Sequence, residues 1–230
     1  MSSRPDTSPA DLLLDWYAVH RRDMPWRRTS DPYAIWISET MLQQTQVATA
    51  TPFWLRWMER FPSVRDLAEA SLDEVLSYWA GLGYYARARN LHAAAKRIVD
   101  EFGGEFPADP ESLRSLPGVG RYTAAAVGSI AFGWDTALVD ANVVRVLCRF
   151  DAIESDPKSS EVVERLWKRA GELLPPGRAG DFNQALMELG ALVCQPEPRC
   201  GACPWNSLCR ANAGGDPKSY PHFAPKPALT

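Results

Sequence analysis

The sequence predicts an all-α fold, because helix-start signals recur along the chain and no alternating run of polar and apolar residues indicates a strand. The chain has 230 residues, of which 46% are hydrophobic and 23% are charged. This is enough for one large domain or for two closely packed lobes with cores. Four of the five cysteines lie within residues 194–209, which indicates a metal centre near the end of the chain.

Capping residues and prolines place the first helices. Asp31 followed by Pro32 predicts a helix over the next ten residues, and Pro52 predicts a second helix start. Ser71 with Glu74 has the pattern of a capping box, which predicts a third helix.

The helical pattern continues through the second half of the chain. A periodic stretch begins at Tyr84, and a short helix opens at Asp109. Residues 122–132 are rich in small side chains that suit close helix packing. Asp140 is a candidate N-cap of the next helix, and residues 181–184 form another capping-box pattern.

The charge and the N-terminus limit the class of protein. The formal net charge is −3, so a nucleic-acid-binding surface would need locally concentrated positive charge. One stretch fits, although an ordinary solvated helix face is the simpler explanation; its basic residues are Arg87, Arg89, Lys96 and Arg97. The sequence has no signal-peptide pattern and no apolar run of membrane-spanning length. We therefore expect a cytoplasmic protein with no membrane partner.

Residues 116–120, Leu-Pro-Gly-Val-Gly, are predicted to connect two helices. Gly118 and Gly120, with Val119 between them, permit a tight turn whose backbone N–H groups point outward. The next helix adds the partial positive charge of its N-terminus. Such a turn can bind a DNA phosphate without a charged side chain, and a plain connection between two helices is the alternative.

The cysteine spacing C-x5-C-x2-C-x5-C favours an iron–sulfur centre. One compact loop with four thiolates can bind a 4Fe-4S cluster, which takes one cysteine per iron. A structural zinc is the alternative, although zinc sites usually combine ligand pairs from segments further apart. The four candidate ligands are Cys194, Cys200, Cys203 and Cys209. The remaining cysteine, Cys148, is interpreted as a small core residue.

Longer motifs resemble a known family. LPGVGRYTAAAV followed by VDANVVRV is similar to the helix–hairpin–helix DNA glycosylases, and the cysteine loop resembles that of their endonuclease III branch. ISETMLQQTQVATATPFW and GLGYYARARNLH resemble the MutY-type adenine DNA glycosylases, which remove adenine mispaired with 8-oxoguanine or guanine. The resemblance covers residues 12–210.

The resemblance implies a two-lobed monomer that binds double-stranded DNA with an A:8-oxoG or A:G mismatch. The expected middle lobe, with the helix–hairpin–helix, is 31–134. The second lobe combines 1–30 with 135–214 and contains the 4Fe-4S cluster loop at 194–209. Residues 215–230 are expected to be a tail or the start of a linker.

The resemblance assigns the chemistry to two carboxyl groups. Breaking the bond to adenine is helped by a proton on N7 and by negative charge beside C1′ of the oxocarbenium-like sugar. Glu39 matches the general acid, and its apolar sequence neighbours suit a protonated carboxyl. Asp140 matches the catalytic aspartate. The alternatives are a surface glutamate and a plain N-cap.

Two further residues match catalytic positions of the family. Glycosylases that also cut the strand have a lysine at the position of Tyr122, which forms a Schiff base. A tyrosine cannot form that imine, so the resemblance implies a monofunctional enzyme whose phenol is hydrogen bonded toward the Asp140 region. Asn142 matches a residue that orients the aspartate or the sugar.

A flipped adenine needs a pocket, and the remaining base stack needs a wedge. Gln44 and Tyr84 match the residues that enter the duplex. The residues that match the adenine pocket are Arg22, Met24, Trp26, Arg27 and Gln184. Core packing is the alternative for the aromatic residues.

The sequence also departs from the family pattern. The first cysteine spacing is one residue shorter than usual, and Ala141 stands where many adenine glycosylases have glycine. Alanine there also occurs in thymine/G-mismatch glycosylases, which makes that activity the alternative. A non-catalytic iron–sulfur DNA-binding protein is the alternative of another class. The family's C-terminal 8-oxoguanine-reading domain is not within these residues, so we expect adenine excision with a weak preference for 8-oxoguanine.

Overall fold

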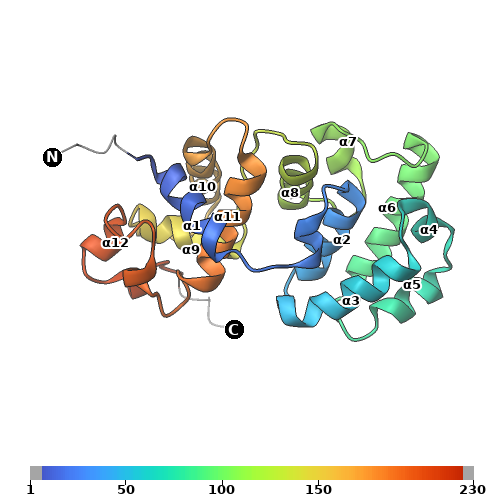
Figure 1. Ribbon diagram of the computed structural model, residues 1–230, viewed down its shortest axis with the longest axis horizontal. Coiled ribbons are helices and arrows are strands. Elements are labelled where there is room, and N and C mark those ends of the chain that lie inside the picture. Colours follow the sequence, from blue (N-terminus) through green and yellow to red (C-terminus); the bar gives the residue numbers. More distant parts are fainter. Residues whose placement is uncertain (1–6, 225–230) are drawn as a thin grey trace, which may run out of the picture. The chain divides into compact units, whose positions relative to one another are not determined.

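The computed structural model describes residues 7–224 (Figure 1). It confirms the all-α prediction, since every regular element within these residues is an α-helix or a short 3-10 helix. The chain divides into two compact units. The central unit comprises Arg22–Trp134, and the terminal unit combines Met1–Arg21 with Asp135–Thr230.

The central unit is built from helices α2 to α8, preceded by the 3-10 helix η1 (Figure 1). Their bounds are η1 Pro25–Arg28, α2 Pro32–Leu42, α3 Val47–Arg60, α4 Val64–Glu69, α5 Leu72–Trp79, α6 Ala86–Phe102, α7 Pro110–Ser115 and α8 Arg121–Ala131. Helix α2 packs against α3, α6 and α8, while α4 and α5 both pack against α6. Helix α2 therefore lies at the centre of this unit.

Helix α2 begins where the sequence predicts, because Asp31 caps it. The Asp31 carboxylate accepts a hydrogen bond from the Tyr33 N–H at 3.0 Å. Pro32 occupies the first turn, where the missing N–H has no partner to lose. Residues 33–41 are all buried. The single carboxyl on this helix must therefore find its polar partners inside the protein.

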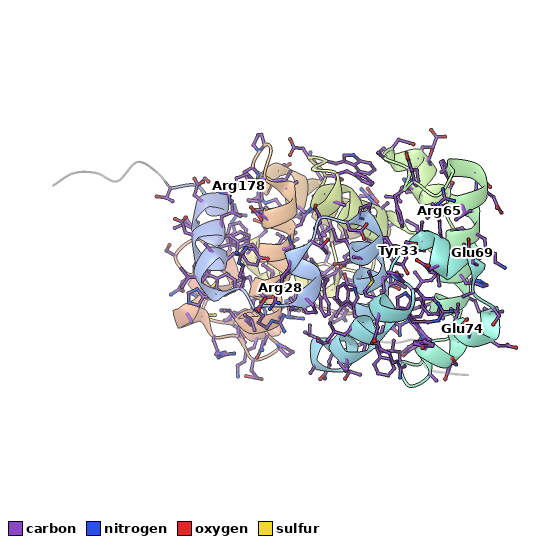
Figure 2. All side chains as sticks on the ribbon, turned by 45° about the vertical axis from the view of Figure 1, so that its right-hand side comes forward. Arg28, Tyr33, Arg65, Glu69, Glu74 and Arg178 are labelled. Carbon is purple, nitrogen blue, oxygen red and sulfur yellow. The ribbon has the colours of Figure 1, made fainter. Side chains whose placement is uncertain are left out.

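Aromatic side chains fill the core of the central unit. Trp36, Trp57 and Trp79 are each at most 1% exposed. The Tyr33 hydroxyl donates to the Phe61 carbonyl oxygen at 2.8 Å and accepts from Trp57 Nε1 at 3.2 Å. Burial raises the pKa of Tyr33, so this phenol stays neutral. Figure 2 shows Tyr33 among the helices, with the labelled charged residues of α4 and α5 toward the outer edge.

The terminal unit is built from α1 and from α9 to α12 (Figure 1). Its elements are α1 Pro9–His20, α9 Ala141–Phe150, α10 Ser160–Leu173, α11 Ala179–Leu192, η2 Cys200–Ala202, α12 Arg210–Ala213 and η3 Pro217–Ser219. Helix α11 packs against α1 and α9, and α9 also contacts α10 and α12. Cys148 on α9 is fully buried, and burial raises the pKa of its thiol to about 11, as suits a core residue.

Two helix starts differ from the prediction. Helix α3 begins at Val47, and Pro52 lies inside it. Pro52 costs this helix one backbone hydrogen bond, while Ala50, Trp54 and Trp57 of the same helix are buried in the core. Helix α11 begins at Ala179, so the second predicted capping box is wrong. Asp181 lies in the first turn instead, where its carboxylate accepts from Arg178 Nη2 at 3.2 Å.

The division between the units falls at residue 22, whereas the sequence placed it at residue 31. Residues 22–30 lie with the central unit because Trp26 packs edge-to-face on Trp54, with ring centroids 5.9 Å apart. In the predicted tail, the Tyr220 carbonyl oxygen accepts from Arg149 Nε at 3.0 Å, and residues 225–230 lie outside the described residues. None of the helices within residues 7–224 has both the length and the apolar character needed to cross a membrane.

Candidate active site

A buried carboxyl and a phenol meet in the interior of the central unit. Glu39 lies on α2 and is 6% exposed. Tyr122 lies in the first turn of α8, which packs against α2. The Tyr122 hydroxyl donates to Glu39 Oε2 at 2.6 Å. The sequence led us to expect this phenol to point toward the Asp140 region, and it did not reveal the contact with Glu39.

This contact holds the Glu39 carboxyl group in one orientation. Burial makes a charged carboxylate costly. The hydrogen bond from the phenol acts in the opposite direction, because a carboxylate accepts it and is favoured by it. The alternative of a surface glutamate is excluded by its burial.

Asp140 is the N-cap of α9, and both of its carboxylate oxygens accept hydrogen bonds. Oδ1 accepts from the Val143 N–H at 2.7 Å, and Oδ2 accepts from Asn142 Nδ2 at 3.0 Å. Burial raises the pKa of Asp140, while these hydrogen bonds and the nearby charge of Arg145 act in the opposite direction. The carboxylate is therefore held rigidly at a helix N-terminus, where its negative charge is favoured.

Arg145 connects Asn142 to the start of the cysteine loop. Its Nη2 donates to Asn142 Oδ1 at 2.9 Å and to the Gly190 carbonyl oxygen at 2.8 Å, and its Nε donates to the Cys194 carbonyl oxygen at 2.7 Å. Helix α11 passes so close that a Cβ added at Gly190 would stand 2.6 Å from Asn142 Cβ. Sequence reasoning missed Arg145 and Gly190. The three-residue spacing of Asn142 and Arg145 on one helix face is the signal that could have indicated their contact.

The four predicted catalytic residues form two pairs. Glu39 and Tyr122 are paired in the central unit, and Asp140 and Asn142 are paired in the terminal unit. Each pair combines one carboxyl group with one hydrogen-bond donor that orients it.

The predicted base-pocket residues are divided between the units. Met24 and Trp26 are each 5% exposed in the central unit. Arg27 Nη1 donates to the Arg22 carbonyl oxygen at 3.1 Å, which shapes the segment before α2. Gln184 lies on α11 in the terminal unit, where its amide donates to the backbone of its own helix at 3.2 Å.

The two predicted wedge residues lie at the surface of the central unit. Gln44 follows α2, and Tyr84 precedes α6. Their φ angles are 59° and 48°, in the left-handed region that non-glycine residues seldom adopt. Tyr84 is 63% exposed, so core packing does not explain this aromatic side chain.

The basic stretch at the start of α6 is not a uniform solvated face. Arg87 is half-buried and donates to backbone carbonyl oxygens. Arg97 pairs with Glu101 at 2.7 Å. Arg89 and Lys96 are exposed. The interpretation as four surface cations is therefore wrong for Arg87.

The hairpin at 116–120 connects α7 to α8. Gly118 has a φ of 75°, and a Cβ there would stand 2.7 Å from Asn90 Cβ, so glycine is required. Val119 is 6% exposed and its N–H donates to the Leu116 carbonyl oxygen at 3.1 Å, which anchors the turn. Gly120 is exposed at the N-cap of α8 and leaves room for an anion there.

The four cysteines of the loop all line one pocket. Within the described part of the chain, no three His, Cys, Asp or Glu side chains are grouped to hold a single metal ion. Burial raises the pKa of Cys203 to about 12 and also raises that of Cys209. Such thiols become good ligands when a metal displaces their protons. The donor set fits a centre with several metal ions better than a single tetrahedral zinc.

Arg149 on α9 supports this loop from inside the terminal unit, and it is 2% exposed. Its Nη1 donates to the Gln195 carbonyl oxygen at 2.5 Å and lies 3.5 Å from Cys194 Sγ. Its Nη2 and Nε donate at 3.0 Å to the carbonyl oxygens of Pro196 and Tyr220. The guanidinium therefore fixes the first segment of the cysteine loop and the segment beyond it.

Residues 37–172 match the family described as HhH-GPD superfamily base excision DNA repair protein. The chain belongs to this family. This HhH-GPD protein is 54% identical over 209 residues to the adenine DNA glycosylase of Homo sapiens, a match covering 86% of the chain and 38% of that relative. It is 40% identical over 222 residues to the adenine DNA glycosylase of Schizosaccharomyces pombe, covering 87% of the chain and 48% of that relative. The chain thus spans less than half the length of these relatives.

Solved structures agree with this assignment. A thermostable thymine-DNA glycosylase matches the HhH-GPD protein with a TM-score of 0.82 and 33% identity, covering 89% of this chain and 95% of that one. Endonuclease III in a non-covalent complex with DNA matches with a TM-score of 0.75 and 26% identity, covering 90% and 94%. The predicted resemblance and the helix–hairpin–helix glycosylase fold are therefore confirmed.

Proposed function

We propose that this HhH-GPD protein is a monofunctional DNA glycosylase that hydrolyses the N-glycosidic bond of adenine mispaired with 8-oxoguanine or guanine. The observation that carries the proposal is the hydrogen bond of 2.6 Å from the half-buried Tyr122 hydroxyl to the buried carboxyl of Glu39. This pair supplies an oriented acid. It also places a phenol where a strand-cutting enzyme needs a lysine amine. The 54% identity to an adenine DNA glycosylase supports adenine as the base removed.

In the proposed reaction, Glu39 donates a proton to N7 of the flipped adenine. The bond from C1′ to the base then breaks, and its electron pair leaves with the adenine. The Asp140 carboxylate stabilises the positive charge that develops on the sugar, and Asn142 keeps that carboxylate in position. Water adds to C1′ and releases a proton to the solvent, and Glu39 takes up a proton from the solvent, which completes the hydrolysis. The pocket that holds the adenine would be formed by Arg22, Met24, Trp26, Arg27 and Gln184.

In the proposed complex, one set of contacts positions the DNA and another set recognises the base. The hairpin with Gly118, Val119 and Gly120 would bind a phosphate through backbone N–H groups and the N-terminus of α8. Gln44 and Tyr84 would enter the duplex beside the target and fill the space that the flipped base leaves. Phosphate contacts of this kind carry no base sequence information, so the wedge and the pocket would determine which base is removed.

Cys194, Cys200, Cys203 and Cys209 would hold a 4Fe-4S cluster. When bound, the cluster supplies four metal–thiolate bonds that cross-link the loop. Burial raises the pKa of Cys203 to about 12, so this thiol would lose its proton only when a metal centre binds it. We assign the cluster a structural role, because its ligands are distinct from the carboxyl groups proposed for the reaction.

The function is tested by strand cleavage after alkali on duplexes that carry A:8-oxoG, A:G or T:G. We expect abasic sites from the two adenine substrates and no cleavage without alkali. Glu39→Gln keeps the shape of the side chain without an acidic proton and should abolish product formation. Borohydride should trap no covalent adduct. Trapping during turnover, or Glu39→Gln activity equal to wild type, would refute the proposed chemistry.

A thymine/G-mismatch glycosylase is the second candidate. Ala141, in the first turn of α9, and the TM-score of 0.82 to a thymine-DNA glycosylase favour it. Release of thymine from the T:G duplex, with none of adenine, would establish this activity. Tight binding of all three duplexes without product would instead indicate a non-catalytic DNA-binding protein.

A further inference from the structure

Arg87 lies inside the central unit, although its sequence context placed it among surface cations. It is the second residue of α6 and is half-buried. Its guanidinium carbon lies 5.1 Å from the centroid of the Trp79 ring and 5.5 Å from that of the Tyr84 ring. A guanidinium enclosed in this way needs several acceptors, since it carries a charge and five N–H donors.

Backbone carbonyl oxygens from two loops supply those acceptors. Nη1 donates to the carbonyl oxygens of Thr40, Met41 and Gln43 at 2.8, 3.0 and 2.6 Å. Nη2 donates to those of Leu82 and Gly83 at 3.2 and 3.4 Å. The first set lies at the C-terminal end of α2, where the last carbonyls lack partners within the helix. The second set lies in the turn between α5 and α6, so one side chain connects two loops that are distant in sequence.

Each of these loops contains one residue in a strained backbone conformation. Among the described residues, the non-glycine residues with positive φ are Gln44, Tyr84 and Ala152. Such conformations persist only where the surroundings impose them. Gln44 follows directly after the Gln43 carbonyl, and Tyr84 follows directly after the Gly83 carbonyl. The same guanidinium therefore fixes the peptide groups that lead into both strained residues.

We propose that Arg87 is a positioning residue that sets Gln44 and Tyr84 at the angle at which they enter the duplex. The proposal rests on the proposed function, which assigns these two residues the wedge role. Without the guanidinium, both residues relax toward ordinary backbone conformations and the wedge loses its orientation. Glu39 and Tyr122 keep their mutual contact, so the loss concerns base extrusion and not the chemical groups.

The test compares Arg87→Met in two backgrounds, the natural sequence and the Gln44→Ala/Tyr84→Ala double variant. Methionine keeps a long apolar side chain at this position and removes the guanidinium. Single-turnover release of adenine from an A:G duplex should fall roughly tenfold or more in the natural background, since part of the unstacking cost is no longer offset. In the double-alanine background the same change should cost less than about twofold, because residues that act through one another are not additive.

Arg165→Met is the control, since Arg165 is exposed on α10, outside the proposed DNA contacts, and its replacement removes the same charge. It should leave the release rate within about twofold of its parent in both backgrounds. A second readout is the fluorescence of 2-aminopurine placed beside the target adenine, which rises when the stack is broken. Wild type should produce that rise on binding, and Arg87→Met should produce less of it.

The outcomes separate the two proposals. A wild-type protein that releases no adenine refutes the proposed function. A wild-type protein that does release adenine, with Arg87→Met equally harmful in both backgrounds, refutes the positioning role alone. If Arg87→Met does not fold, Arg87→Lys is measured in the same two backgrounds, because a lysine cannot bridge both loops. Additive losses for that variant would overturn the proposal, and a loss confined to the natural background would support it.

Discussion

Replacement of Asp140 by asparagine separates the two roles that the structure gives this side chain, the capping of α9 and the provision of negative charge. An asparagine oxygen can accept the bond that the Val143 N–H donates to Asp140 Oδ1 at 2.7 Å. Asparagine and aspartate are about equal as N-caps, whereas alanine costs about 1 kcal/mol. The bond from Asn142 to Oδ2 is lost, which costs about 1 kcal/mol.

The raised pKa of Asp140 means that the same substitution also stabilises the fold. Burial raises the pKa of Asp140 in the folded state, so at neutral pH the charged carboxylate is less favourable in the folded protein than in the unfolded chain. Asparagine carries no charge and removes this cost of burying the carboxylate. The losses and the gain oppose each other at neutral pH. We therefore expect Asp140→Asn to change the free energy of unfolding by less than about 1 kcal/mol, which is a shift of the melting temperature of roughly 2–4 °C at most.

The effect on the reaction should be far larger. A preorganised group that stabilises transition-state charge contributes roughly 100-fold or more to the rate. Thermal unfolding and single-turnover adenine release are measured together for Asp140→Asn and Asp140→Ala. Asp109→Ala is the control, because Asp109 caps α7 by accepting from the Ser112 N–H at 2.8 Å. It should cost about 1 kcal/mol of stability without changing the rate. An Asp140→Asn protein that releases adenine at the wild-type rate would show that Asp140 is only a cap.

Three further changes test other parts of the site. Burial raises the pKa of Asp140, so the excision rate should begin to fall on acidification at a higher pH than it would for an exposed aspartate. The charge of Arg145 lowers this pKa, so Arg145→Met should move the acidic side of the pH–rate profile to higher pH. A pH–rate profile whose acidic side does not move would contradict this. Gly190→Ala should destabilise the fold by about 1–3 kcal/mol in thermal unfolding, because the new Cβ overlaps α9, whereas Gly171→Ala in open space should not. Cys203→Ser should lower the iron content and the melting temperature of anaerobically purified protein, and stoichiometric zinc without iron in wild type would refute the cluster assignment.

The helix starts could be predicted where the chemistry is local. Asp31, Asp109 and Asp140 cap their helices as predicted, because each cap bond spans only two or three residues. Pro52 gave a wrong start for α3, because this helix accommodates a proline in its interior at the loss of one backbone hydrogen bond. Side-chain caps are therefore readable from the sequence, whereas a proline alone does not mark a helix start.

The contacts that build the site could be predicted only in part. Glu39 and Tyr122 were each identified, but they are 83 residues apart and nothing local indicates that they meet. Arg87, Arg145 and Arg149 were missed as internal residues, because arginine is mostly found at the surface. Most of their acceptors are backbone carbonyl oxygens, which every residue carries, and only the three-residue spacing of Arg145 and Asn142 gives a signal in the sequence.

The buried guanidinium of Arg149 has a consequence for the order in which a metalloprotein is assembled. In zinc fingers the metal drives folding, because the ligands are not held together before it binds. Here the carbonyl oxygens of Gln195, Pro196 and Tyr220 are tied to α9 by the protein's own hydrogen bonds. The two ends of the segment that contains the cysteine loop are therefore held by the protein itself, and part of the entropic cost of closing the loop is met during folding of the chain. We expect these contacts to form before a metal centre binds, and the metal centre to cross-link only the part of the loop between them.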